Sequence, residues 1–591
     1  MPRGRGRATH GRNPEQGART RPLGASAWAV AAWVAAAALP LAFLGLFFLW
    51  PVLSLVATGF LADGGIGGIG AGRLDLSGIP EVFGSPRTWK VIGQTLAQAG
   101  LATVISVALG LPAAHVLYRL QFRGRGILRG LLTVPFVLPT VVVGVAFSAL
   151  TGEGGPLAFL GLDRSLAAIV LALAFFNVTV LARTVGGFWA RLDDRAEQAA
   201  MVLGAGRIRA WLTVTLPALA PALASAAALV FLFSSTSFGI VLILGGREFS
   251  NVETEIYRLT VQYLDLRGAA VLSLAQFAIV GAALWVSARL RAAGERAVEL
   301  LPEGQQLRRP GRGDVPAIVA LAVTALLLHG LPILTLVARS LRGPGGEWTL
   351  ANYAALVSPP ADLPLDAPVT SAIWLSLRMA LVAALLAMAL GVLLALVLSR
   401  RPERPGLRRA LSLFDGLVML PLGVSAVTLG FGLLITMHRP LGIGLDLRTS
   451  VALIPIAQAL VALPLVVRTL LPVLRGIDQQ LRFAAATLGA GPLAVLRTVD
   501  LPLLGRSAGL ALGFAFAASL GEFGATSFLV RPGEQTLPVA VARLIGHQAP
   551  GSYGAGLAAA VLLGALAAGV MLLAERFRAD GRLGAQGRAE F

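Results

Sequence analysis

Long apolar segments separated by short polar ones dominate the pattern of this chain. Each apolar segment is roughly 20 residues or longer, the length that an α-helix needs to cross a bilayer. The pattern therefore predicts about twelve membrane-spanning helices. We expect them at residues 27–60, 91–118, 128–150, 165–189, 217–245, 268–290, 314–338, 371–399, 411–435, 450–472, 503–530 and 553–574.

The composition supports an all-α polytopic membrane protein. Of 591 residues, 56% are hydrophobic and 13% are charged, and the mean hydropathy is +0.77. Soluble domains carry about 25% charged residues. Cysteine is absent, which excludes disulfides and thiol chemistry. The five histidines are scattered, and no catalytic triad, carboxylate pair or metal-ligand cluster is apparent, so we predict neither an enzyme nor a metal site.

The net charge of +19 reflects the distribution of arginine among the loops. Arginines cluster after the second, sixth, eighth and last apolar segments, whereas the loop after the fifth is acidic, with Glu248, Glu253, Glu255 and Asp265. The positive-inside rule explains this alternation and places both termini in the cytoplasm. We therefore expect no nucleic-acid partner, and we interpret residues 1–26 as a basic cytoplasmic tail rather than a signal peptide.

An internal repeat relates the two parts of the chain. Gly489 follows Gly204 by 285 residues, and the same offset relates Ala484 to Ala199 and Pro502 to Pro217. The repeat predicts a first half at 27–290, a cytoplasmic linker at 291–313, a second half at 314–575 and a C-terminal tail at 576–591. Because each half has an even number of spans, the two six-helix repeats insert in parallel.

Two polar segments stand in register within this repeat. They read EQAAMVLGAGRIRAWLTVTLP at 197–217 and RFAAATLGAGPLAVLRTVDLP at 482–502, within loops 191–217 and 476–502. Alanine favours a helix, glycine permits the turn that ends it, and proline suits the first turn of the following span. We expect a short surface helix that offers small side chains to a partner. A plain alanine-rich connection is the alternative, and the second matched copy argues against it.

These segments resemble the "EAA" loop in the permease subunits of binding-protein-dependent ABC importers. The resemblance implies the type I permease fold and a coupling role for each loop, which would seat in one of two identical ATPase subunits. The residues that carry this role over are Glu197, Gln198, Ala199, Ala200, Gly204, Pro217, Phe483, Ala484, Ala485, Gly489 and Pro502. Gln198 and Phe483 stand where the family usually has glutamate, which departs from its pattern.

The source of energy is expected on another chain. The sequence contains no G-x-x-x-x-G-K-[ST] phosphate loop, so we assign ATP-Mg to a partner ATPase and no cofactor to this chain. An ion-driven secondary carrier is the alternative, but such carriers use ionisable residues within the membrane, which are nearly absent here. Glu522 is the exception. It and Ser237, Asn177 and Gln458 are candidates for the translocation path, with helix capping or interhelical hydrogen bonding as the alternative.

The predicted solute depends on the resemblance alone. The stretch from Thr236 to Gln276, with VETEIY at 252–257, resembles thiamine importer permeases, which are related to ferric-iron permeases. The segment GEFGATSF at 521–528 is closer to permeases for oxyanions such as molybdate. We expect import of thiamine or a phosphorylated relative, with ferric iron and an oxyanion as alternatives. An extracytoplasmic binding protein, a bacterial inner-membrane location and a cycle of alternating access follow from the same resemblance.

Overall fold

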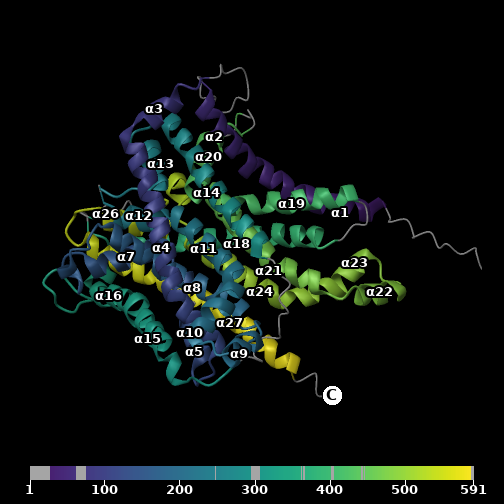
Figure 1. Ribbon diagram of the computed structural model, residues 1–591. Coiled ribbons are helices and arrows are strands. Elements are labelled where there is room, and N and C mark those ends of the chain that lie inside the picture. The colour runs from purple at the N-terminus through teal and green to yellow at the C-terminus, as the bar shows by residue number, and fades with distance from the viewer. Residues whose placement is uncertain are drawn as a thin grey trace, which may run out of the picture.

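The computed structural model shows an all-helical chain (Figure 1). It describes residues 27–61, 75–132, 134–246, 248–294, 307–360, 363, 367–400, 405–440, 444 and 446–586. The predicted basic tail at 1–26 and residues 295–306 of the predicted linker lie outside these ranges. Within them, extended pairing is limited to three isolated bridges. The predicted all-α class is confirmed.

The helices of the two halves follow one another in matching order. Those of the first half are α1 (Ala27–Leu44), α2 (Trp50–Phe60), α3 (Gly78–Gly84), α4 (Pro86–Arg119), α5 (Arg125–Leu131), α6 (Val134–Val137), α7 (Thr140–Thr151), α8 (Leu166–Trp189), α9 (Arg195–Val202), α10 (Arg207–Ala210), α11 (Leu216–Ser235), α12 (Phe238–Leu244), α13 (Val252–Val261) and α14 (Leu266–Gly294). Those of the second half are α15 (Val315–Val323), α16 (Leu331–Ser340), α17 (Ala351–Val357), α18 (Val369–Leu398), α19 (Pro405–Gly423), α20 (Ala426–Thr436), α21 (Leu453–Gly476), α22 (Gln479–Thr487), α23 (Pro492–Val495), α24 (Leu501–Leu520), α25 (Thr526–Leu529), α26 (Leu537–Gly546) and α27 (Ser552–Gln586).

Nine helices in the described ranges are long and apolar enough to cross a membrane, or up to twelve if each bent pair counts as one span. Two predicted spans bend at equivalent positions. The third turns by 98° before Thr140 and the ninth by 94° before Ala426. Pro139 stands at the first break, where it cannot donate a backbone hydrogen bond, and at the second the Ser425 hydroxyl caps α20 by accepting from Thr428 N. The sequence predicts one helical span at each of these places, and the structure divides each into two helices that meet at a bend.

Four spans share a π-helical turn, and in each a proline follows after one intervening residue. The turns are Gly45–Leu49, Trp211–Thr215, Thr324–Gly330 and Leu496–Asp500, followed by Pro51, Pro217, Pro332 and Pro502. A proline ring clashes with the carbonyl of the preceding turn, and a widened turn relieves that clash. Pro217 therefore begins α11, as the sequence predicts, yet the helical backbone already starts at Arg207.

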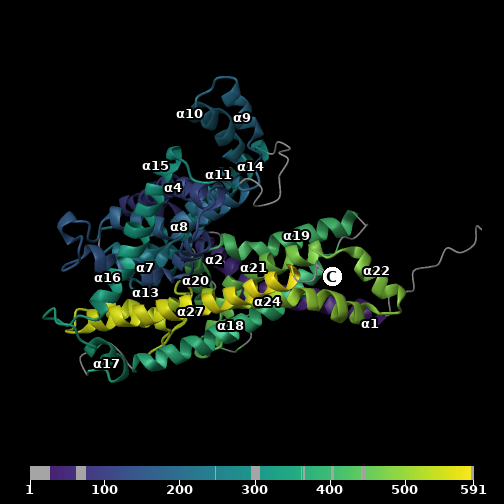
Figure 2. The same cartoon turned by 90° about the horizontal axis from the view of Figure 1, so that it is seen from below.

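The first span of each half packs against the other half. In the first half, α1 contacts α18 and α2 contacts α20. The second half repeats this arrangement, because α15 contacts α4, as Figure 2 shows, and α16 contacts α7. Leu44 and Phe48 of the first span are buried in the same core cluster as residues of α18, α20 and α21. The two halves thus share one apolar core through exchanged helices.

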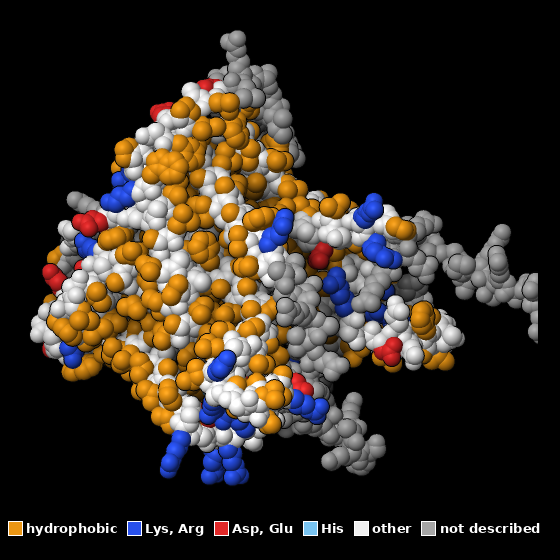
Figure 3. Space-filling view, in the orientation of Figure 1, with side chains coloured by type: hydrophobic (Ala, Val, Ile, Leu, Met, Phe, Trp, Pro, Cys, Tyr) orange, Lys and Arg blue, Asp and Glu red, His pale blue; other side chains and the backbone are white. Residues whose placement is uncertain are grey.

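The outer surface is largely apolar. Large side chains along the spans are exposed, among them Val104 at 66%, Leu326 at 69% and Trp374 at 67%. Figure 3 shows hydrophobic side chains across most of the visible face, while Lys and Arg side chains gather at the bottom, near α9 and α10, and at the right, near α19 and α22. Exposed apolar helices need a lipid environment, so this is a multi-pass membrane protein.

Candidate functional site: two surface loops and the interface between the halves

Each predicted coupling loop contains one short helix, α9 in the first half and α22 in the second. Both helices end in the same way, at a glycine with positive φ: +92° at Gly204 and +85° at Gly489. In the first loop, Gly204 N donates to Met201 O and Ala205 N donates to Ala200 O, both at 3.0 Å. The equivalent bonds of the second loop are also 3.0 Å long. These are Schellman motifs, and glycine occupies the left-handed position without strain.

The two loops expose equivalent side chains. Gln198 and Ala199 are exposed in the first loop, as are Phe483 and Ala484 in the second, whereas Ala200 and Ala485 are half-buried. The most exposed apolar residues are Leu203 at 88% and its equivalent Leu488 at 89%. The sequence predicted a face of small side chains only. Instead, each loop also projects leucine into the surroundings, which is typical of a surface that binds another protein.

A side-chain link holds each short helix against the following span. Thr215 donates a hydrogen bond to the Glu197 carboxylate in the first half. At the equivalent positions of the second half, Arg482 donates to Asp500 at 2.8 Å, and Asp500 is fully buried. The linked positions are equivalent in the two halves, but the carboxylate lies on the short helix in the first half and next to the following span in the second. Glu197 and Arg482 therefore face their own bundle, which leaves the other side of each helix free for a partner.

The end of the second span in each half is also tied to its loop. Arg119 at the end of α4 pairs with Asp194, directly ahead of α9. Arg400, just beyond α18, pairs with Asp500 at 3.5 Å. Burial raises the pKa of the Asp194 carboxyl, and Arg119 opposes that effect. These ion pairs thus connect each loop to the end of a long span of the bundle.

An additional anchor ties the start of the seventh span to the first half. Asp314, at the start of the seventh span, accepts hydrogen bonds from Arg308 at 2.6 and 2.7 Å, from Arg207 at 3.0 Å and from Gly311 N at 2.9 Å. His115 Nε2 lies 3.0 Å from the same carboxylate. The side chains of His115, Arg207, Arg308 and Asp314 line a cavity of about 790 Å³ beside α9. The described end of the linker is therefore fixed to the first coupling loop.

The halves meet where the fifth and eleventh spans break. The sequence predicted one helix at 217–245 and one at 503–530, but α11 ends at Ser235 and α24 at Leu520. Ser237 and Glu522 are equivalent residues within these breaks, and both are buried. Glu522 accepts hydrogen bonds from Ala525 N at 2.7 Å and Thr526 N at 3.0 Å, so its carboxylate caps α25. The Ser237 carbonyl accepts from Asn251 Nδ2 at 2.7 Å.

An aromatic cluster closes this interface. Phe238 and its equivalent Phe523 stack with ring centroids 5.1 Å apart. Tyr257 of α13 contacts Phe238 at 5.2 Å and Phe528 of α25 at 5.4 Å. Three of the rings belong to helices that follow the breaks, whereas Phe523 lies within the second break, between α24 and α25. The cluster lies between the halves, at the end of α11 and α24 farthest from the coupling loops.

Glu253 is a buried carboxylate in the segment that the sequence predicted to be an acidic loop. It lies at the start of α13, is fully buried, and accepts a hydrogen bond from the Ser425 hydroxyl of the second half. Its Oε1 has no partner among the described residues. Asn251 caps α13 through a reciprocal bond with Thr254, and the Asn-x-x-Thr spacing was the available signal for this helix.

The other two path candidates lie on separate helices. Asn177 of α8 donates to Ser234 Oγ of α11 at 3.1 Å, an interhelical bond. Gln458 of α21 is buried, and its Oε1 has no partner among the described residues. The described hydrogen bonds connect neither residue to Ser237 or Glu522.

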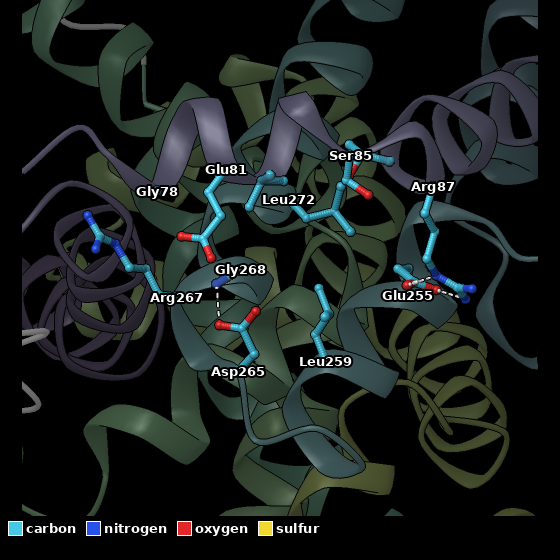
Figure 4. Close-up of a pocket in the computed structure, with 12 residues that line it drawn as sticks. Gly78, Glu81, Ser85, Arg87, Glu255, Leu259, Asp265, Arg267, Gly268 and Leu272 are labelled. Carbon is cyan, nitrogen blue, oxygen red and sulfur yellow. Dashed lines mark hydrogen bonds and ion pairs between the residues drawn. The ribbon is translucent and has the colours of Figure 1, made fainter.

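A small cavity of about 200 Å³ lies at the other end of the first half from α9, between α3, α13 and α14. Figure 4 shows two of its interactions: Arg87 points to Glu255, and Asp265 accepts from the Gly268 backbone. Arg267 pairs with Asp75 at 2.9 Å. Arg87 and Arg267 are each paired with a carboxylate, which favours a structural role for these two side chains.

No family model matches the chain. It is 28% identical over 510 residues to the thiamine transport system permease protein of Brucella abortus, covering 83% of this chain and 88% of that protein. It is 33% identical over 175 residues to the sulfate transport system permease protein of Escherichia coli, covering 28% of this chain and 62% of that protein. A probable molybdenum ABC transporter permease of Haloferax volcanii is 35% identical over 148 residues, covering 25% and 55%.

Among solved structures, a bacterial ABC transporter involved in alginate import matches with a TM-score of 0.37 and 18% identity. The match covers 46% of this chain and 96% of the other. The relationship to the thiamine permease extends through both repeats, whereas the sulfate and molybdenum permeases match shorter segments. The chain is therefore a homologue of ABC transporter permeases over most of its length.

Proposed function

We propose that this protein is the membrane subunit of an ATP-driven importer that moves thiamine or a phosphorylated relative into the cytoplasm. The observation that carries the proposal is the pair of equivalent helices α9 and α22, each with an exposed outer side and a side-chain link to its own bundle. The thiamine permease of Brucella abortus, similar over 83% of the chain, supports the solute class.

The two helices would receive one ATPase subunit each. They lie well apart in Figure 1, α9 at the bottom and α22 at the right, which suits two separate docking points. The exposed Leu203 and Leu488 would enter the cleft of each subunit, beside Ala199 and Ala484. ATP-Mg would bind to those subunits. Because the ATPase subunits would be cytoplasmic, α9, α22 and both termini would face the cytoplasm of a bacterial cell.

The transport cycle would use the closed aromatic cluster as its outer gate. Closure of the ATPase dimer would draw the coupling loops together, and the pairs Arg119–Asp194 and Arg400–Asp500 would transmit the movement to α4 and α18. The halves would then part between Phe238 and Phe523, and an extracytoplasmic binding protein would deliver the solute. Exchanged first spans would keep the halves joined throughout.

A second candidate solute is an oxyanion, favoured by the sulfate and molybdenum permeases that match about a quarter of the chain. Uptake into proteoliposomes tests the proposal. The full chain, its ATPase and its binding protein, taken from neighbouring genes, are reconstituted and supplied with labelled thiamine, molybdate or ferric iron. ATP-dependent accumulation of thiamine is expected. Accumulation without the ATPase, driven by an ion gradient, would contradict the importer.

A further inference from the structure

The two buried carboxylates at the interface between the halves differ in how they are satisfied. Both oxygens of Glu522 accept backbone N–H groups of its own half. Glu253 accepts a single hydrogen bond, from Ser425, and its Oε1 has no partner among the described residues. A buried carboxylate in this condition is costly and is retained where it serves a function. Glu253 is therefore the unexplained group.

A second acidic residue of α13, by contrast, has an arginine partner. Glu255, two residues along α13, receives Arg87 Nε at 2.5 Å and Nη2 at 2.9 Å, as Figure 4 shows. It faces α4 within its own half. Glu253 instead faces Ser425 of α20, across the meeting line of the halves. Of the two carboxylates, the one without a cationic partner among the described residues is therefore Glu253, which faces the other half.

Glu253 shares its side of α13 with an aromatic residue. Tyr257 lies four residues later, one helical turn away, and contacts Phe238 and Phe528. Phe523 completes the group by stacking on Phe238. Carboxylates combined with aromatic faces are the groups that bind organic cations, through charge attraction and cation–π contacts. The same carboxylate would repel an oxyanion.

We propose that Glu253 and the rings of Phe238, Tyr257, Phe523 and Phe528 contact the solute when the halves part, and that this solute is a positively charged organic molecule. The inference rests on the proposed importer function and defines its substrate class. A hard metal cation is a poorer fit, because it needs several oxygen or nitrogen ligands, and no group of three such side chains occurs among the described residues. The thiazolium ring of thiamine has the required charge and aromatic character.

The test compares Glu253→Gln with the wild type in proteoliposomes containing the ATPase and the binding protein. Glutamine keeps the shape and can still accept from Ser425 but lacks the charge. We expect ATP-dependent thiamine uptake to fall at least tenfold, while ATP hydrolysis stimulated by the loaded binding protein stays within about twofold. Glu255→Gln, which removes a charge from the same helix on its other side, is the matched control and is expected to keep uptake within about twofold. Thermal unfolding in detergent confirms that both variants fold.

Two results would overturn the inference and leave the importer function standing. One is wild-type uptake of molybdate or ferric iron without thiamine. The other is thiamine uptake by Glu253→Gln at the wild-type rate. If the wild type accumulates none of the three solutes in the presence of ATP, the proposed function itself is refuted, and the inference falls with it.

Discussion

Phe238 stacks on Phe523 with an angle of 23° between the ring planes, and the two residues occupy equivalent positions in the two halves. A residue that contacts its own counterpart lies at the symmetry axis of a pseudo-twofold assembly. The stack therefore lies on the axis between the two halves, where the proposed function places the outer gate. Gly239 and Gly524, the next residues, pack closely on Thr140 and Ala426 of their own halves, so each ring is held by a rigid support.

Cysteine labelling at this stack reports the opening directly. Because the chain has no cysteine, Phe238→Cys introduces a single thiol, buried in the closed state. We expect a membrane-impermeant maleimide to label it at least tenfold faster when the ATPase is trapped in its ATP-bound state. Phe159→Cys, at a position that is 80% exposed in the loop after α7, is the control and should react equally in both states. Equal labelling of the Phe238→Cys variant with and without nucleotide would contradict a gate at this place.

The opening equilibrium is expected to depend on pH through Glu253, which lies outside the membrane-spanning helices. Burial raises the pKa of its carboxyl to about 8 in the closed state, and the Ser425 hydroxyl partly opposes that effect. In an open, hydrated state the pKa returns towards its ordinary value of about 4.3. Closing therefore takes up a proton, so the closed state is favoured at low pH and loses this advantage as the pH rises through 8.

The measurement is the labelling rate of Phe238→Cys in the absence of nucleotide, between about pH 6 and pH 9 after correction for thiolate formation. We expect the corrected rate to rise with pH in the otherwise wild-type chain. In the Glu253→Gln background it should be flat, because glutamine does not titrate. A rise of the same size in both backgrounds would assign the pH dependence to another group.

The ion pair behind α22 and the hydrogen bond behind α9 predict different losses of stability when equivalent residues are replaced. Asp500→Ala leaves Arg482 and Arg400 without their carboxylate, and breaking a buried ion pair costs about 3–5 kcal/mol. Thr215→Ala removes only the hydroxyl that donates to Glu197, at a cost of about 1 kcal/mol. Melting in detergent should therefore occur at a clearly lower temperature for Asp500→Ala. Equal shifts would show that the second link stores no extra stability.

A double substitution tests whether the links are interchangeable. Glu197→Arg alone places a cation beside Thr215 and should reduce ATP-dependent uptake several-fold. Adding Thr215→Asp recreates the arginine–aspartate pair of the second half in the first. We expect the double variant to recover most of the uptake. If it recovers nothing, Glu197 has a role beyond holding α9.

The glycines that end the coupling helices are expected to tolerate no β-branched residue. A Cβ at Gly204 or Gly489 meets no atom within 4 Å, so the cost of valine comes from the positive φ, about 1–2 kcal/mol, and from unwinding of the turn. Uptake and ATPase binding should fall, while membrane insertion is unchanged. Gly206→Ala is the matched control, because Gly206 has φ −62° and equally open surroundings. Full uptake by both valine variants would contradict the docking role of these loops.

Sequence periodicity predicted the helical class, the approximate spans and the equivalence of the coupling loops, because these depend on local pattern and on a fixed offset. The bends before Thr140 and Ala426 were missed, although Pro139 is visible in the sequence, since apolar length alone does not distinguish a straight helix from a bent one. The 285-residue offset of the repeat identifies equivalent residues, but it does not indicate whether a helix packs against its own half or the other one. The exchange of α1 and α2 with α15 and α16 therefore appeared only in three dimensions.

Among the candidate site residues, those of the two loops lie in short local motifs, so the sequence alone indicates the short helices and the glycines that end them. Glu253 was assigned to an acidic loop because a hydropathy pattern reads a glutamate as exposed. Its burial results from packing of α13 against α20 of the other half. Glu522 was noticed because its surroundings are apolar, and its carboxylate caps α25. Side-chain partners of this kind depend on tertiary contacts that one sequence does not encode locally.

The exchanged first spans constrain how the protein is made. α1 packs against α18, so its final neighbour is synthesised more than 300 residues after it enters the bilayer. Until then its apolar side must be covered by lipid or by an insertion chaperone. If translation stopped between the repeats, the released first half would lack α18, the helix against which α1 packs. Because both repeats belong to one polypeptide, each α1 is supplied with one α18, and both helices insert at the same place in the membrane.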